Sequence, residues 1–308
     1  MKKIFIILIG LLSLQSYTTP KVVAVVSEKD VVWSFSFISE NEIIYTLKEQ
    51  GKAYLYNFLT KKKLILNTPK IYATGQGGLL DIHYNEEKGK KYIYYTFSER
   101  KEEKAITSLA KGELVNNKIV SLKTIFQAKL KTGRGVHFGS RLVFDKNHIF
   151  MTIGDRGERE LAQNVSFHNG KILRLNFDGT AATNNPFVSN KKALPEIWSL
   201  GHRNPQGITK GFNSNKLYSV EFGPRGGDEL NLIKKGVNYG WPIITYGKEY
   251  WGPSIGQKSK KGLEQPIKYW VPSISPSGMD FYRGKKLSKW TGSLFIANLS
   301  SKHLRRLV

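Results

Sequence analysis

His137 is the side chain of this sequence best suited to acid–base chemistry. It stands in "GRGVHFGSRLVF", after a glycine-rich turn and directly before an apolar segment typical of a strand. An imidazole can take up or release a proton near neutral pH, so a histidine in this position is a candidate general base. A lone histidine can equally be structural or merely exposed, and its position alone leaves these roles open.

Two further segments place polar groups in turns. Arg203 and Asn204 stand in "GHRNPQGI", where glycines and an Asn-Pro step are ordinary turn chemistry. Gly223 and Pro224 stand in "EFGPRGGDELN", and a rigid turn of this kind can direct backbone carbonyls at a hard cation such as calcium. The segment "GQGGLLDI" places Gln76 in a similar position before a strand. Most segments of this type are simply turns, and none identifies a function by itself.

The elements that must position these residues recur along the chain. Five short segments rich in β-branched and aromatic residues centre on Ile43, Ile93, Ile149, Leu217 and Leu294. Each follows another short apolar segment, and no long amphipathic helix separates the pairs. Paired strands at this spacing predict the blades of an all-β propeller, with a β-sandwich as the alternative. The connections lengthen along the chain, and in a propeller such loops gather at one mouth of the central channel.

The N-terminal residues have the layout of a secretion signal. Two lysines precede an apolar run, and small polar residues follow it. We therefore expect residues 1–19 to be a signal peptide, residues 20–308 to form one propeller domain, and the protein to be periplasmic or otherwise exported. A short membrane anchor is the alternative. The apolar run is too short to span a bilayer comfortably, so we expect no membrane span after cleavage.

Composition excludes several kinds of chemistry. The 308 residues include no cysteine, which rules out disulfides, thiolate catalysis and cysteine-bound zinc. The formal charge of +24 invites a nucleic-acid interpretation, but the lysines are spread through the chain and no nucleic-acid motif is present. We therefore expect a solvated, lysine-rich surface and no nucleic-acid partner.

The motifs taken together resemble one family. The segments "GQGGLLDI", "HFGSRLVF", "TIGDRGER", "WSLGHRNPQGI", "EFGPRGGDELNLIKKGVNYGWP" and "SGMDFYRG" occur in the order found in the soluble quinoprotein glucose/sorbosone dehydrogenases, which include the aldose sugar dehydrogenases. The resemblance covers roughly residues 30 to 308. It implies a six-bladed β-propeller that binds pyrroloquinoline quinone (PQQ) and calcium at the channel mouth.

The resemblance also implies roles for the residues singled out above. His137 matches the general base that takes the proton of the anomeric hydroxyl while the hydride leaves for the quinone. Gln76, Arg203 and Asn204 match positions facing the cofactor, and the carbonyls of Gly223 and Pro224 match calcium ligands. The aldose would become a lactone, and an external electron acceptor would reoxidise the quinone.

Tyr250 and Glu264 resemble positions that hold a second, structural calcium in some members of the family. The oligomeric state is not implied by these motifs.

The sequence departs from the family pattern in three places. Val136 stands where some members have an acidic residue before the histidine, and Ser300 stands where the family has a lysine that contacts the cofactor. If residues 300 and 302 belonged to one strand, Lys302 would point to the same side and could take that lysine's place. The chain also ends at Val308, whereas the family continues through a sixth blade, so we expect a propeller lacking most of its last blade.

These departures keep two other functions open. A propeller that has lost its redox site could bind carbohydrate or a protein partner without catalysis. A lactonase-type hydrolase would need several carboxylates around a calcium in the channel, and the sequence does not show that pattern.

Overall fold

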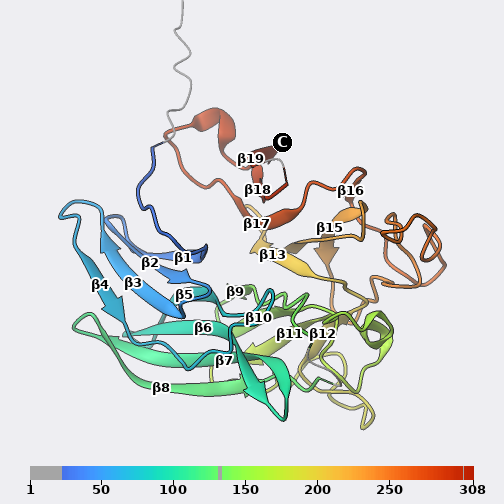
Figure 1. The fold of residues 1–308 in the computed structure, drawn as a ribbon, viewed down its shortest axis with the longest axis horizontal. Helices are drawn as coiled ribbons and strands as arrows, with labels where there is room; N and C mark the ends of the chain where they lie inside the picture. Colours follow the sequence, from blue (N-terminus) through green and yellow to red (C-terminus); the bar gives the residue numbers. More distant parts are fainter. Residues whose placement is uncertain (1–22, 131–133, 301) are drawn as a thin grey trace, which may run out of the picture.

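The computed structural model describes residues 23–130, 134–300 and 302–308, and antiparallel sheets dominate them (Figure 1). The predicted signal peptide lies outside the described residues. Among these described residues, four sheets have four strands and one has three. In chain order the sheets comprise β1 (Val32–Ser39), β2 (Glu42–Leu47), β3 (Lys52–Asn57) and β4 (Lys63–Leu66); β5 (Leu79–Glu87), β6 (Lys90–Lys101), β7 (Lys104–Val115) and β8 (Lys118–Gln127); β9 (Leu142–Phe144), β10 (His148–Ile153), β11 (Lys171–Asn176) and β12 (Ile197–Leu200); β13 (Pro205–Lys210), β14 (Leu217–Glu221), β15 (Asp228–Ile233) and β16 (Lys268–Trp270); and β17 (Pro276–Phe281), β18 (Leu294–Asn298) and β19 (His303–Leu307).

In the described part of the chain, two short 3-10 helices lie in the connections between strands. They are η1 (Arg159–Gln163) and η2 (Ser288–Trp290). In Figure 1 the sheets follow one another around a centre, from blue β1–β4 through green β9–β12 to red β17–β19. The fold is an all-β propeller with five blades, as expected for a six-bladed propeller that lacks one blade.

The internal repeat predicted from the sequence is the blade. All five anchor residues lie on the second strand of their sheets, and the apolar segment upstream of each forms the first strand. Successive strands within a blade pair in sequence order. Apolar side chains from neighbouring blades fill the space between sheets, as where Ile153 and Leu173 of the third blade pack with Leu109 of the second. Burial between blades therefore holds each sheet against the next.

One arginine ties the blades together at the centre of the ring. The Nε atom of Arg141, which directly precedes β9, donates to the carbonyl of Gln206 at 2.8 Å. Its Nη2 atom donates to the carbonyls of Trp33 and Ser277 at 3.4 and 3.2 Å, and Nη1 lies 3.5 Å from Asp81 Oδ1. These partners belong to the four other blades, so the guanidinium links the third blade to each of them.

The first and last blades each present an apolar face that is only partly covered. Phe35 and Phe37 on β1 are 59% and 58% exposed, and Leu304 on β19 is 60% exposed. The inner strands of the five blades line a central hollow of about 660 Å³ that reaches these faces. Such faces suit packing against a further sheet.

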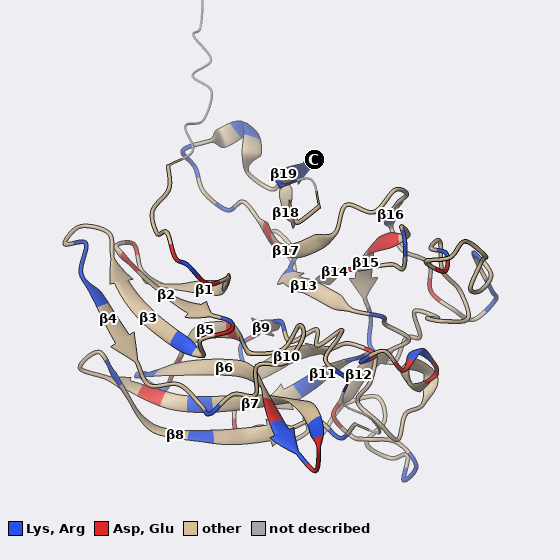
Figure 2. Ribbon diagram, in the orientation of Figure 1, with Lys and Arg blue, Asp and Glu red and all other residues tan. Residues whose placement is uncertain are grey.

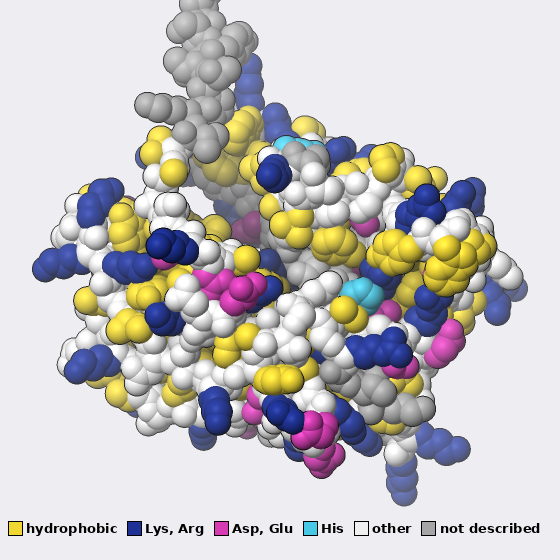
Figure 3. All heavy atoms as spheres, in the orientation of Figure 1, with side chains coloured by type: hydrophobic (Ala, Val, Ile, Leu, Met, Phe, Trp, Pro, Cys, Tyr) yellow, Lys and Arg dark blue, Asp and Glu magenta, His cyan; other side chains and the backbone are white. Residues whose placement is uncertain are grey.

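Charge is distributed over all five blades rather than concentrated on one. Lysine and arginine occur along the strands and turns of every sheet (Figure 2). Figure 3 shows their side chains scattered over the visible face and its rim. Within the described ranges, no helix is both long and apolar enough to cross a bilayer.

Candidate functional site at the channel mouth

The residues singled out by sequence come together at one rim of the propeller. Gln76, His137 and Arg203 precede the innermost strands β5, β9 and β13, and Gly223 follows the second strand β14. In an antiparallel pair, the beginning of one strand lies beside the end of the next. Loops that enter first strands and loops that leave second strands therefore meet at the same edge of every blade.

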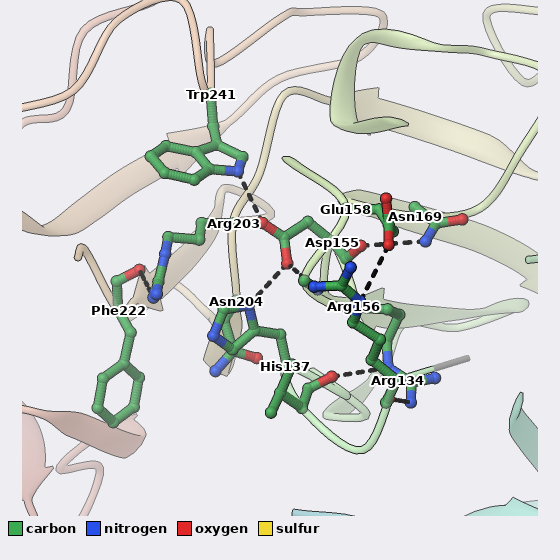
Figure 4. A network of polar contacts seen from close by, with 12 residues as sticks. Arg134, His137, Asp155, Arg156, Glu158, Asn169, Arg203, Asn204, Phe222 and Trp241 are labelled. Carbon is green, nitrogen blue, oxygen red and sulfur yellow. Dashed lines mark hydrogen bonds and ion pairs between the residues drawn. The ribbon is translucent and has the colours of Figure 1, made fainter. Parts of the chain in front are cut away.

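The centre of this rim is a histidine–aspartate pair (Figure 4). His137 Nδ1 lies 2.7 Å from Asp155 Oδ1, and the side chains are 17% and 2% exposed. An ionised carboxylate only accepts hydrogen bonds, so this contact assigns the ring proton to Nδ1 and leaves the lone pair on Nε2. His137 is thereby set up as a base at Nε2.

Asp155 is held as an anion by a set of donors. Its Oδ1 accepts from the backbone N–H of Gly157 at 2.8 Å, and its Oδ2 accepts from Trp241 Nε1 at 2.8 Å. Burial alone would raise the pKa of Asp155, but the hydrogen bond and charge interaction with His137, helped by Arg203, bring that pKa below its ordinary value. The carboxylate therefore stays ionised and can stabilise a positive charge on the imidazole.

Close backbone approaches fix the position of His137. A Cβ at Gly154 would stand 2.0 Å from the His137 carbonyl oxygen, so only glycine allows this contact. His137 itself has a φ of 50°, an uncommon conformation for a residue other than glycine. The backbone N–H of His137 donates to Gln76 Oε1 at 2.8 Å.

A buried arginine secures the segment before His137. Arg156 donates through Nε to the carbonyl of Val136 at 2.8 Å and through Nη1 to that of Ala105 at 2.8 Å, and Nη2 donates to the carbonyl of Arg134. Burial lowers the pKa of Arg156 to about 9, which still leaves it charged at neutral pH. The loop that carries the base is thus tied to the second blade.

Hydrogen-bond donors surround the histidine. Asn204 Oδ1 accepts from the backbone N–H of Gly139 at 3.2 Å and from Gln206 Nε2 at 3.1 Å, which leaves the Nδ2 group of Asn204 to donate elsewhere. Since Gln76 Oε1 is used by His137, the Nε2 group of Gln76 is likewise a donor. With the Arg203 guanidinium, this rim suits a ligand rich in anionic and carbonyl oxygens.

Arg203 is oriented from both ends. Its backbone N–H donates to Glu221 Oε2 at 2.7 Å. Its Nη1 faces the carbonyls of Phe222 and Gly223 at 3.2 and 3.4 Å, and its Nη2 lies 3.5 Å from the hydroxyl oxygen of Tyr250. Arg203 as a whole residue is 7% exposed, so it is largely shielded from water.

The turn at Gly223 and Pro224 gathers backbone oxygens. A Cβ at Gly223 would stand 2.3 Å from the carbonyl oxygens of both Gly226 and Gly227. The Pro224 carbonyl accepts from the backbone N–H of Lys248 at 3.0 Å, which leaves its second lone pair free. A hard cation prefers such oxygens, and an anionic ligand between it and Arg203 would reduce the repulsion of the two positive charges. The donor set at this turn fits the predicted calcium.

Tyr250 and Glu264 have other partners in the structure. The hydroxyl of Tyr250 faces Arg203, its carbonyl accepts from Arg225 Nη1 at 2.8 Å, and Glu264 Oε1 lies 2.7 Å from Lys234 Nζ. Tyr250 therefore adjoins the candidate active site. The structural calcium stays a prediction.

The comparison of Ser300 with Lys302 assumed a strand, and that assumption is wrong. Residues 299, 300 and 302 lie between β18 and β19 and belong to neither strand, and Lys302 has a φ of 49°. The alternation of side chains along a strand therefore does not apply, and both residues are exposed.

Sequence reasoning missed Asp155 and Trp241 as functional residues, although both lie inside quoted motifs. Asp155 follows the buried strand β10 within "TIGDRGER", and a carboxylate directly after a buried strand was the available signal. Trp241 is 86 residues away from Asp155 along the chain, and only the fold brings the two together.

Comparisons with known proteins agree with this architecture. A model of the Glucose / Sorbosone dehydrogenase family matches residues 29–308. The aldose sugar dehydrogenase YliI of Escherichia coli strain K12 is 37% identical over 284 residues, covering 89% of this chain and 76% of that protein. A crystal structure of a glucose dehydrogenase shares 36% identity with a TM-score of 0.88, covering 94% of this chain and 86% of that chain.

A further structure, the PQQ-bound form of an aldose sugar dehydrogenase from Streptomyces coelicolor, has a TM-score of 0.77 at 24% identity. The match covers 93% of this chain and 79% of that chain and shows a common fold. The protein is thus a β-propeller of the quinoprotein type, with a histidine–aspartate pair at the channel mouth. It belongs to the glucose/sorbosone dehydrogenase family.

Proposed function

We propose that this protein is an exported, PQQ- and calcium-dependent dehydrogenase that oxidises aldose sugars at C1 to lactones. The observation that carries the proposal is the His137–Asp155 pair, which lies among the donors of Gln76, Arg203 and Asn204. PQQ, when bound, would supply the two-electron oxidant, and an external acceptor would then take the electrons. Export rests on the signal-like residues 1–19.

In the proposed reaction His137 Nε2 accepts the proton of the anomeric hydroxyl. The imidazole becomes positively charged, and Asp155 stabilises that charge while keeping the proton on Nδ1. Trp241 and Gly157 hold the carboxylate in place, so it need not reorganise as the charge develops. Asp155 thus acts on the reaction through His137.

Binding the quinone is the proposed task of Arg203, Asn204 and Gln76. Arg203 offers a charge in a mostly buried setting, where an anionic oxygen is bound more strongly than at an exposed lysine. The carbonyls of Gly223 and Pro224 would hold calcium beside it. The hydroxyl of Tyr250 lies 3.5 Å from Nη2 of this guanidinium.

The test is a titration of the purified protein with PQQ and calcium, followed by absorbance, with aldoses added afterwards. We expect saturable binding followed by bleaching. His137→Gln should bind the quinone and fail to bleach it, whereas Arg203→Ala should bind it at least tenfold more weakly. A wild-type protein that binds no quinone would refute the proposal. Glycan binding in that event would favour a non-catalytic carbohydrate-binding propeller.

A further inference from the structure

A second hollow lies between the third and fourth blades, at the rim opposite the candidate active site. It is bordered by His148, where β10 begins, and by Lys210 and Leu217, where β13 ends and β14 begins. The other ends of these same strands, at Ile153, Pro205 and Glu221, adjoin the histidine–aspartate site. The hollow has a volume of about 710 Å³, within the usual range of small-molecule sites.

The chemical feature of this hollow is an arginine that forms no direct ion pair with any carboxylate of the described residues. Arg174, on β11, is 7% exposed and lines the hollow. Its Nη2 atom reaches two neutral acceptors, His148 Nε2 at 3.1 Å and Asn184 Oδ1 at 2.6 Å. Among the ion pairs of the described residues none includes Arg174, and its buried Nε atom has no hydrogen-bond partner there.

The nearest carboxylate is held apart from Arg174 by an imidazole. Asp145 Oδ1 lies 3.4 Å from His148 Nδ1 and also accepts from the backbone N–H groups of Asn147 and His148 at 2.8 Å. Because His148 accepts from Arg174 through Nε2, its proton is on Nδ1 and faces Asp145. A buried cation with only neutral contacts is unfavourable unless a counter-ion joins it. Burial accordingly lowers the pKa of Arg174.

The remaining lining combines an apolar floor with a cationic rim. Phe150 and Trp198 pack edge to face with ring centroids 5.4 Å apart, and Trp198 Nε1 is a second buried donor without an acceptor among the described residues. Lys146, Lys210 and Lys216 border the hollow and form no ion pair in the described part of the chain. The two buried groups of this lining that lack a partner among the described residues are both donors, and these three lysines border the hollow beside one carboxylate, Asp145, so the complementary ligand is an acceptor-rich anion with an apolar body.

We propose that this hollow is a binding site for a small organic anion, a carboxylate or phosphate ester carried on an apolar group. Its anionic head pairs with Arg174 and the rim lysines, and its apolar body packs on the floor formed by Phe150 and Trp198. The site lies apart from the quinone and sugar positions and does not depend on the proposed dehydrogenase activity.

The experiment is a calorimetric titration of the full, purified protein with phenyl phosphate, without quinone or sugar. Inorganic phosphate and benzyl alcohol serve as probes that lack the apolar body or the charge. Two variants alter the site, Arg174→Gln and the rim pair Lys146→Gln/Lys216→Gln. The control pair Lys62→Gln/Lys88→Gln removes the same charge from exposed turns of the first and second blades. Thermal unfolding confirms that each variant is folded.

We expect saturable binding of phenyl phosphate that weakens with salt, at least tenfold weaker binding in Arg174→Gln, and roughly threefold weaker binding in the rim pair. The control pair should bind as the wild type does. If Arg174→Gln fails to fold, the proposal is tested by comparing the affinity of the rim-pair variant for phenyl phosphate with that of the control-pair variant. No saturation at millimolar probe, equal binding of benzyl alcohol, or equal loss in both lysine pairs would overturn the proposal.

Discussion

Replacing Asp155 with asparagine tests the proposed chemistry at one atom pair. Asp155 accepts from three N–H groups, those of His137, Gly157 and Trp241. Asparagine has one acceptor oxygen and one NH2 group, so it cannot accept on both sides. Either Trp241 loses its acceptor, or His137 is faced by an NH2 group and adopts the other tautomer, with its proton on Nε2.

The expected loss follows from the separation of the charges. With His137 Nδ1 and Asp155 Oδ1 2.7 Å apart, the centres of the spread charges lie about 4 Å apart, where an effective dielectric constant of about 20 gives about 4 kcal/mol. This interaction exists only when the imidazole is protonated, so its loss raises the barrier. At 1.36 kcal/mol per tenfold change, kcat should fall by about a thousandfold.

The assay is sugar oxidation with an artificial electron acceptor, run on protein loaded with PQQ and calcium. Quinone binding is measured separately, and Asp155→Asn should keep it within about fivefold of the wild type because Asp155 acts through the histidine. Asp178→Asn, the same change in an exposed turn, is the matched control. A kcat within threefold of the wild type in a quinone-loaded Asp155→Asn protein would refute this account of the pair.

Three further predictions concern packing, ring closure and pH. Gly154→Ala should lower kcat at least tenfold and lower the free energy of unfolding by about 2 kcal/mol or more, because the added Cβ meets the His137 carbonyl oxygen. The sugar-oxidation assay and urea unfolding measure these two effects, and wild-type values in both would contradict the clash. Arg141→Met should lower the free energy of unfolding in urea by about 3–5 kcal/mol. Arg141→Lys should lower it somewhat less, because lysine keeps the charge and loses only the planar, forked donor group. A loss below about 1 kcal/mol for Arg141→Met would show that the blades do not depend on these central hydrogen bonds. Because the pKa of Asp155 is depressed in the folded state, its stabilising contribution is fully present above its ordinary value of 3.8 and is lost as pH falls through the folded value. The difference in unfolding free energy between wild type and Asp155→Asn should therefore shrink as pH falls below about 4, and a difference that keeps growing below that pH would reverse the assigned shift.

The propeller could be predicted from the sequence because its signal is repetitive. Ile43, Ile93 and Ile149 each sit on the second strand of a blade, and one correct repeat fixes the register of the others. The rim positions of His137 and Arg203 follow from the same logic, since each precedes a first strand. The repeat therefore made both the fold and the general location of the site predictable from the sequence.

Contacts between distant loops could not be read in the same way. The partnership of Asp155 with Trp241 and the reach of Arg141 to Ser277 depend on how blades close into a ring, which no local pattern encodes. The turn at Ser300 shows a different limit: the strand assumption there was wrong because β18 ends at Asn298, and strand ends are poorly marked by composition. The hollow at Arg174 could not be predicted either, because the sequence does not show that this arginine is buried or that it forms no ion pair in the described part of the chain.

The contacts of Arg141 also bear on how this molecule comes apart. In an array of repeats that touch only their neighbours, each unit adds its own stability and the ends can open independently. Here one side chain has contacts with non-adjacent units, so releasing any blade exposes hydrogen-bonding groups at the centre that belong to the rest. Partial opening therefore carries a cost shared by the whole ring. We therefore expect unfolding to be cooperative, because the contacts of Arg141 make the blades tend to unfold together rather than one by one.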